Sequence, residues 1–152
     1  MNPQLKAQLD TVTETARALL ELQGALMPTA FIIGAKVQII GCPWRSVAEK
    51  DAAVRVLRDT ARKNKAHTFI LLSEIWHAPV GEHWDGRPAV DQLGAREAVG
   101  VYVETTEDGH WSGLADIVRK NGKATFGPVS YKPMGERDAR ERFQKILPEG
   151  VT

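Results

Sequence analysis

The sequence contains a single cysteine, Cys42, and this scarcity excludes two kinds of architecture. One thiol cannot form an internal disulfide, and it cannot supply a zinc site built from several cysteines. The chain also has no window that approaches the roughly 20 apolar residues that a membrane helix requires. Residues 1–10, MNPQLKAQLD, lack the apolar core of a secretory signal. We therefore expect a cytoplasmic protein.

An excess of charge of either sign is missing as well. The chain has 20 Lys and Arg residues against 19 Asp and Glu residues, which gives a formal charge of +1. Overall charge therefore attracts the protein neither to nucleic acid nor to an anionic membrane, so binding of either kind would need a local basic patch. Nucleic acid and membranes are thus not the expected partners.

The longest apolar run, Phe69-Ile70-Leu71-Leu72, lies within residues 66–78, AHTFILLSEIWHA. The run is apolar at both odd and even positions and is too short to indicate a helix, which is typical of a strand that is covered on both faces. Such a strand lies in the middle of a sheet. Polar and aromatic residues follow it at once, and we expect a functional site there.

Residues 3–23 have the periodicity of an amphipathic helix, with Asn2 as N-cap and Gly24 as C-terminal cap. The apolar positions recur at steps of three and four residues: Leu5, Leu9, Val12, Ala16, Leu19 and Leu20. Two explanations of this stripe remain open. It packs on the sheet, or, because it follows heptad steps over three turns, it forms a helix pair in a homodimer.

Residues 29–41 are rich in β-forming side chains, and Gly34-Ala35 in the middle indicates the turn of a hairpin. Ser46 and Glu49 then match a capping box, which predicts a helix over residues 47–64. The inner face of this helix is expected to carry Val47, Val54, Leu57 and Ala61. Together with the strand that follows, this order is typical of a parallel crossover.

Residues 79–94 are predicted to be a loop, because Pro and Gly interrupt them repeatedly. Asp108-Gly109 and Asn121-Gly122 are dipeptides of type I′ turns, so they predict a three-strand antiparallel meander over residues 97–106, 110–119 and 123–131. Pro128 suits an edge strand. A short helix is expected near the C-terminus, with Ala139, Phe143, Ile146 and Leu147 on its apolar side.

These elements predict a single α+β domain over residues 1–152, with a mostly antiparallel sheet of about five to six strands packed against two to three helices. Residues 1–24 form the N-terminal amphipathic helix. Residues 29–131 form the sheet with one inserted helix, and residues 136–147 form the C-terminal helix.

Five residues after the central strand could hold a divalent metal, because they combine imidazole and carboxylate groups: Glu74, His77, Glu82, His83 and Asp85. Their spacing matches no HExxH motif, and on a strand Glu74 and His77 point to opposite faces. The alternative is that Glu74 is hydrogen-bonded at the strand end and that the following loop is a solvated or partner-facing surface.

Two further residues are candidates for catalysis. Cys42 lies before a helix N-terminus and near Arg45, where a thiol pKa would fall, so it is either a nucleophile or a small buried residue. In the register set by the Asp108-Gly109 turn, Asp116 would face Val101 on an apolar surface and have a raised pKa. A bulge at Gly113 would instead return Asp116 to solvent, and a buried, hydrogen-bonded aspartate is the other explanation.

Basic and aromatic residues offer binding surfaces. Arg55, Arg58, Arg62 and Lys65 follow one side of the second helix and could meet phosphates, although Asp59 can pair with Arg55 and a solvated helix face is the alternative. Of the four tryptophans, Trp76 and Trp111 lie inside predicted strands and are expected in the core. Trp44 and Trp84 lie in loops and are better candidates for a contact surface.

No complete catalytic motif is present, so we expect a binding protein without a cofactor, whose partner is a protein or a small ligand. The predicted binding surface combines the Trp/His-rich loop 76–87 with the connector before the second helix, and its residues are Trp44, Arg45, Trp84 and Arg87. The alternative is a metal-dependent or acid/base hydrolase centred on Glu74, His77 and His83. A third hypothesis is nucleic-acid binding through the basic helix stripe.

Overall fold

The computed structural model describes residues 1–78, 84–135 and 145–148. In chain order the elements are α1 (Pro3–Gln23), β1 (Thr29–Ile33), β2 (Val37–Gly41), α2 (Val47–Lys63), β3 (Thr68–His77), the short 3-10 helix η1 (Ala89–Asp91), β4 (Arg96–Thr105), β5 (His110–Lys120), β6 (Lys123–Phe126) and β7 (Ser130–Pro133).

All seven strands of the described residues belong to one sheet, in the order β2-β1-β3-β4-β5-β6, and β7 also pairs with β5. Every pairing is antiparallel. The predicted α+β class is therefore confirmed, and β3 occupies the middle of the sheet as its apolar run predicts. Strands β2 and β3 run parallel with β1 between them, so α2 forms the crossover between parallel strands.

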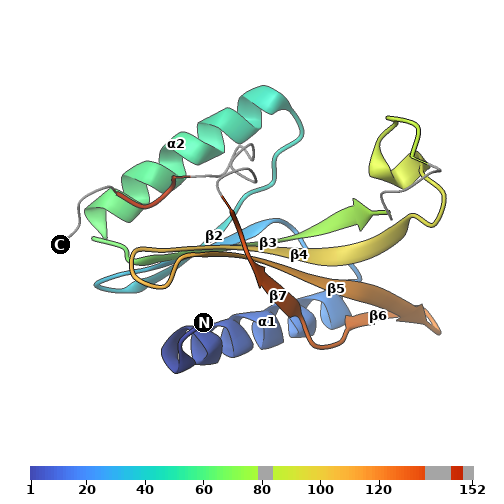
Figure 1. The fold of residues 1–152 in the computed structure, drawn as a ribbon, viewed down its shortest axis with the longest axis horizontal. Helices are drawn as coiled ribbons and strands as arrows, with labels where there is room; N and C mark the ends of the chain where they lie inside the picture. The colour runs from blue at the N-terminus through green and yellow to red at the C-terminus, as the bar shows by residue number, and fades with distance from the viewer. Residues whose placement is uncertain (79–83, 136–144, 149–152) are drawn as a thin grey trace.

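The sheet separates two apolar cores, because α1 covers one face and α2 the other (Figure 1). We call these the α1 face and the α2 face. Side chains alternate along β3, so Ile70 and Leu72 pack in the core under α1, whereas Phe69 and Leu71 pack in the core under α2. No helix of the described residues is long and apolar enough to cross a membrane.

Helix α1 has the bounds and caps that its sequence predicts. The Asn2 side chain accepts the N–H of Leu5, and Gly24 adopts the left-handed conformation at the C-terminal cap. The apolar stripe is buried against the sheet, as the first of the two explanations requires: Leu5, Leu9, Val12, Ala16 and Leu20. Arg17 extends this contact, since its Nε donates to the Phe126 carbonyl at 2.7 Å.

The hairpin of β1 and β2 is confirmed, although its turn extends over residues 34–36. Asn64, which follows α2, is buried and holds this turn with its side chain. Its Oδ1 accepts the N–H of Lys36 at 3.1 Å, and its Nδ2 donates to the Lys36 carbonyl at 2.8 Å. The predicted helix α2 is confirmed, with Ser46 as its N-cap.

Two details of α2 differ from the prediction. Val47 is 59% exposed, because it lies in the first turn, where the helix has not yet reached the sheet, whereas the other three predicted inner residues are buried. The Glu49 carboxylate accepts the N–H of Arg45. In a capping box it would instead accept the N–H of Ser46.

The predicted meander differs from the structure in its last strand and first turn. The last strand is two short strands, β6 and β7, which both pair with β5 at the edge of the sheet. Asn121 and Gly122 both have positive φ, as a type I′ turn requires, but at the first turn only Gly109 does. Five residues, 105–109, separate the last facing pair of β4 and β5, in place of the predicted two. The Thr105 hydroxyl at the end of β4 stabilises this longer loop, because it donates to the Gly109 carbonyl and accepts the Asp108 N–H.

Most of the predicted C-terminal helix, residues 136–144, lies outside the described residues. Residues 145–148 are described and are not helical. Ile146 and Leu147 are buried in the core under α2. The Glu104 carboxylate holds them, because its oxygens accept the N–H groups of Ile146 and Leu147, each at 3.0 Å.

Candidate functional site

A cleft of about 680 Å³ lies on the part of the α2 face that α2 leaves uncovered. Helix α2 is tilted, so that its N-terminal end stands farther from the sheet than its C-terminal end (Figure 1). The strand register builds the floor in rows of facing residues. One row is Leu71, Tyr102, Ser112 and Lys132, and the next is Ser73, Gly100, Leu114 and Ser130.

Several residues on the floor of the cleft are small. Gly100 has no side chain, and the Ile75 side chain packs over it, because a Cβ at Gly100 would meet the Ile75 Cδ1 at 3.0 Å. Ser73 and Ser112, on the strands to either side, are also small. Ser73 and Ser112 each bring a hydroxyl group to the floor.

The rim of the cleft is aromatic and cationic. Trp44, in the connector before α2, and Lys50, in the first turns of α2, line one side, and Lys132 of β7 also lines the cleft. The Lys50 ammonium lies 5.8 Å from the centre of the Trp44 ring, in the range of a cation–π contact. Trp44 is half-buried and separates this cleft from a cavity of about 360 Å³ beside Cys42.

Beyond the cleft, on the same face of the sheet, His77 meets Asp116. The His77 Nε2 lies 2.8 Å from the Asp116 Oδ1, and the Arg96 Nη1 lies 3.3 Å from the Asp116 Oδ2. Three adjacent strands, β3, β4 and β5, thus supply an imidazole, a guanidinium and a carboxylate. The structure therefore brings together two of the four candidate catalytic residues.

The predicted register of Asp116 is wrong. Asp116 faces Ala98, three positions from Val101, and the ladder between β4 and β5 runs without a bulge at Gly113. The five-residue loop 105–109 causes this offset, because it moves the first facing pair to Glu104 and His110. Asp116 consequently lies on an exposed surface beside the His77 imidazole and the Arg96 guanidinium.

Glu74 points to the opposite face of β3 from His77, as the strand alternation predicts. Its Oε1 accepts the N–H of Leu26 at 2.7 Å, so the carboxylate holds the connection between α1 and β1. Among residues 1–78, 84–135 and 145–148, no group of three His, Cys, Asp or Glu side chains is placed to hold a metal ion. Glu82 and His83, the other two candidate ligands, lie outside the described residues.

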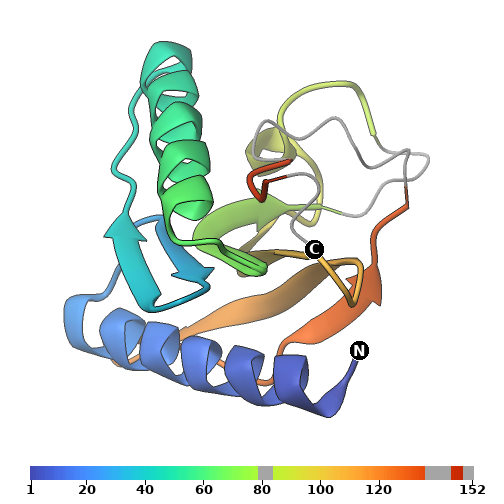
Figure 2. The ribbon, with the colours of Figure 1, turned by 90° about the vertical axis from the view of Figure 1, so that its left-hand side faces the viewer.

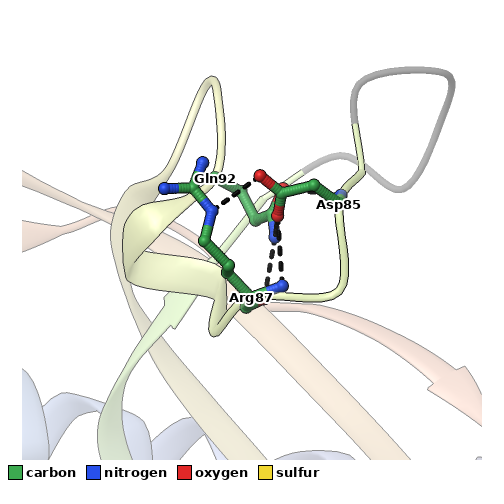
Figure 3. A network of polar contacts seen from close by, with 3 residues as sticks. All are labelled: Asp85, Arg87 and Gln92. Atoms are coloured by element: carbon green, nitrogen blue, oxygen red, sulfur yellow. Dashed lines mark hydrogen bonds and ion pairs between the residues drawn. The ribbon is translucent and has the colours of Figure 1, made fainter.

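The Asp85 carboxylate stabilises the loop that follows the central strand by accepting hydrogen bonds from within it. It accepts the Arg87 Nε at 2.6 Å, the Arg87 N–H at 3.1 Å and the Gln92 Nε2 at 2.7 Å (Figure 3). These bonds lower the pKa of Asp85, chiefly the bond from the Arg87 N–H and then that from Gln92. Gln92 is buried and also donates to the Arg87 carbonyl. Residues 84–94 therefore form a loop with internal order.

The loop exposes large apolar side chains around this polar centre: Trp84, Val90 and Leu93 are 37%, 45% and 70% exposed. Arg45 and Arg87 of the predicted binding surface are exposed as well. Trp76 is 48% exposed at the end of β3, which contradicts its predicted place in the core. It lies beyond the part of the sheet that α1 covers.

Cys42 has the environment of a small buried residue. It is 5% exposed and packs in the core under α2. Burial raises the pKa of its thiol. A nucleophilic cysteine needs a lowered pKa, so the structure favours the second of the two explanations.

Several basic side chains of α2 form hydrogen bonds or ion pairs within the protein. Arg58 donates to the Lys145 carbonyl at 3.1 Å, and Arg62 and Lys63 pair with Asp59. The sequence predicted Arg55 as the partner of Asp59. The structure instead pairs Asp59 with Arg62 and Lys63, which lie three and four residues after it. Both lower the pKa of Asp59, and the hydrogen bond from Lys63 contributes most.

Sequence reasoning missed Lys50, Lys132 and the serines of the cleft floor. One signal was present, because a glycine inside a strand, such as Gly100, often marks a site where another group approaches the backbone closely. The partners across the sheet depend on the register, which the sequence did not establish.

No curated protein and no solved structure gives a significant match to this chain. A protein-family model described as bacteriophage lambda protein ea47 matches residues 1–141. The matched region contains both helices and all seven strands of the described residues. The chain therefore belongs to the bacteriophage lambda protein ea47 family.

Proposed function

We propose that this protein is a binding protein whose cleft on the α2 face takes an anionic ligand with a flat apolar part. The observation that carries the proposal is the rim of the cleft, where Trp44 lies under the Lys50 ammonium and Lys132 adds a second positive charge. Trp faces hold flat groups, and lysine side chains attract anions.

Among the described residues that line the cleft, the charged side chains on its side of the sheet are both lysines. Glu74 is among its lining residues, but the Glu74 carboxylate is bonded to the Leu26 N–H on the α1 side of the sheet. The remaining charged lining residues are Lys50 and Lys132. Hydroxyl groups of Ser73 and Ser112 on the floor can donate hydrogen bonds to the same ligand.

The cleft also has a suitable size. Its volume of about 680 Å³ falls in the range of roughly 300–1,000 Å³ that is typical of small-molecule sites. A mononucleotide combines the required charge with a flat ring, so mononucleotides are the first ligands to test.

The experiment follows thermal unfolding in the presence of mononucleotides, inorganic phosphate, divalent metals and single- and double-stranded nucleic acids. A ligand at about one hundred times its dissociation constant adds about 2.7 kcal/mol to the free energy of unfolding, which raises Tm by a few degrees. We expect a nucleotide to raise Tm of the native protein, and the rise to be lost in Lys50→Ala and Lys132→Ala.

Lys123→Ala is the matched control, because Lys123 is an exposed lysine at the start of β6, outside the cleft. It should keep the ligand-induced rise in Tm. The proposal would be contradicted if no anion in the panel raised Tm. It would also be contradicted if the ligand raised Tm equally in all three lysine variants. Trp44→Ala should weaken binding of the nucleotide more than binding of phosphate, since phosphate has no ring to stack.

The exposed apolar side chains of loop 84–94 favour a second candidate function, the binding of a protein partner. A loop with internal order loses little conformational entropy when it binds. Trp84→Ala and Leu93→Ala should weaken such a complex, whereas Val118→Ala, at another exposed apolar position, should not. Equal affinity of all three variants would remove this candidate.

The close pair of His77 and Asp116 favours a third candidate function, acid/base hydrolysis. An imidazole oriented by a carboxylate is the arrangement of a general base. Activated esters and phosphate monoesters are suitable first substrates. Hydrolysis that persists unchanged in His77→Ala would exclude this role of the pair.

A further inference from the structure

Strand β2 ends the sheet and leaves one of its sides open. Among the described residues it pairs with β1 alone (Figure 2). Two of its side chains, Val37 and Ile39, are 63% and 62% exposed on the α1 face. An edge strand with exposed apolar residues can accept another strand.

The hydrogen bonds at the ends of the hairpin show which backbone groups face outward. The Cys42 N–H donates to the Pro28 carbonyl at 2.7 Å, and the Gly34 N–H donates to the Lys36 carbonyl at 3.1 Å. Hydrogen-bonded pairs alternate along an antiparallel ladder, so Gln38 and Ile40 bond to β1. The N–H and C=O groups of Val37, Ile39 and Gly41 therefore point away from the sheet.

Strand β2 lacks the usual features that protect an edge from pairing. Its sequence, VQIIG, contains no charged residue and no proline, and its register with β1 is continuous. Natural edge strands are commonly blocked by a lysine, a proline or a bulge. Lys36 precedes the strand and lies outside it.

We propose that a second copy of this chain docks on β2 in antiparallel orientation, with the two-fold axis beside Ile39. The strand is complementary to itself in this register. Ile39 faces Ile39 of the second copy, and Val37 faces Gly41, so each outward N–H meets a carbonyl group. The two sheets then continue into one.

Side-chain packing fits the same register. Gly41 has no side chain, and the Met27 Sδ lies 3.1 Å from the position that its Cβ would take. Met27 is 50% exposed. Val37 of one copy therefore contacts Met27 of the other on the α1 face, while the two Ile39 side chains contact each other. The pairing buries apolar residues and leaves no charge within the paired strands.

The first experiment measures molar mass by analytical ultracentrifugation over a dilution series. We expect the native protein to be a dimer that dissociates on dilution. Ile39→Lys should shift the midpoint of dissociation to at least about tenfold higher concentration, because two lysines would face each other across the axis. Val56→Lys, at a similarly exposed position on α2, should leave the midpoint unchanged.

The second experiment tests the register by oxidation in a Cys42→Ala background. Hydrogen-bonded partners in an antiparallel pair have Cα atoms about 5.5 Å apart, within the range of a disulfide. Ile39→Cys should therefore form a disulfide-linked dimer on oxidation. Val37→Cys should not, because the two copies of residue 37 are separated by four residues, or roughly 13 Å.

Three outcomes would overturn the proposal. The first is a native protein that is a monomer at every concentration. The second is an Ile39→Lys protein that dimerises as well as the native protein. The third is cross-linking of Val37→Cys without cross-linking of Ile39→Cys. Leu22→Lys tests α1, where Leu22 is 81% exposed. A dimer that is lost in Leu22→Lys and kept in Ile39→Lys would place the interface on α1. Circular dichroism checks that each variant is folded.

Discussion

The carboxylate of Glu104, on β4, accepts the backbone N–H of Ile146, 42 positions later in the chain. Its other oxygen accepts the Leu147 N–H, and the Tyr102 hydroxyl lies 3.3 Å away. Glu104 is 4% exposed. A buried carboxylate with several donors thus fixes residues 146–147 against the core under α2.

Glu104→Gln should destabilise the protein by about 2–3 kcal/mol. Hydrogen bonds to a charged group contribute about 1.5–3 kcal/mol, and the Gln NH₂ group would face a backbone N–H that needs an acceptor. Urea unfolding measures the loss. Glu107→Gln is the control, since Glu107 is exposed on the adjacent loop. Equal stability of the two variants would show that the Glu104 bonds contribute nothing measurable.

Gly34→Ala should also destabilise the protein, by at least about 1–3 kcal/mol, which is typical of overpacking. A Cβ at this position would lie 2.3 Å from the Asn64 carbonyl oxygen, a backbone atom that the buried Asn64 side chain holds in place. Gly127→Ala is the matched control, because a Cβ there meets nothing within 4 Å. Chemical unfolding of both variants checks the prediction, which fails if Gly34→Ala is as stable as the control.

Cys42 should react slowly with a thiol reagent in the folded protein. Only the thiolate is nucleophilic, and burial both raises the pKa of Cys42 and limits access to it. Iodoacetamide at pH 8 should modify the native protein at least about tenfold more slowly than the urea-unfolded protein. Similar rates in the two states would revive Cys42 as a nucleophile.

The network around Asp85 should be insensitive to pH down to about 4, which is the ordinary pKa of an aspartate. Its folded-state pKa is lowered, so its contribution is fully present above the unfolded value and is lost as pH falls through the lowered value. The NMR shifts of the Gln92 side-chain amide report this loss. Asp85→Asn should change them at neutral pH, and Asp91→Asn should not. A change that begins well above pH 4 would contradict the assignment.

Local signals gave much of the fold correctly. Asn2 and Gly24 mark both ends of α1, Ser46 marks the start of α2, and Asn121-Gly122 marks a turn, because these features depend on a few neighbouring residues. The Asp108-Gly109 turn was the exception. There the Thr105 side chain supplies hydrogen bonds that favour a longer loop, and this changed the partners of every residue in β5.

The candidate site was less predictable than the fold. His77 and Asp116 were candidates separately, but their contact depends on the pairing of β3, β4 and β5. Trp44 and Lys50 are only six residues apart, but Lys132 joins them at the cleft because β7 pairs with β5. Such contacts depend on residues far apart in the sequence.

The sequence by itself determined the two helices, the central apolar strand and the α+β class, since hydrophobic periodicity and caps act within a few residues. Only the tertiary structure decided the register of β5, the cleft on the α2 face and the open edge at Val37 and Ile39. Strand pairing caused this difference, because each of these features requires partners that are brought together by the whole sheet.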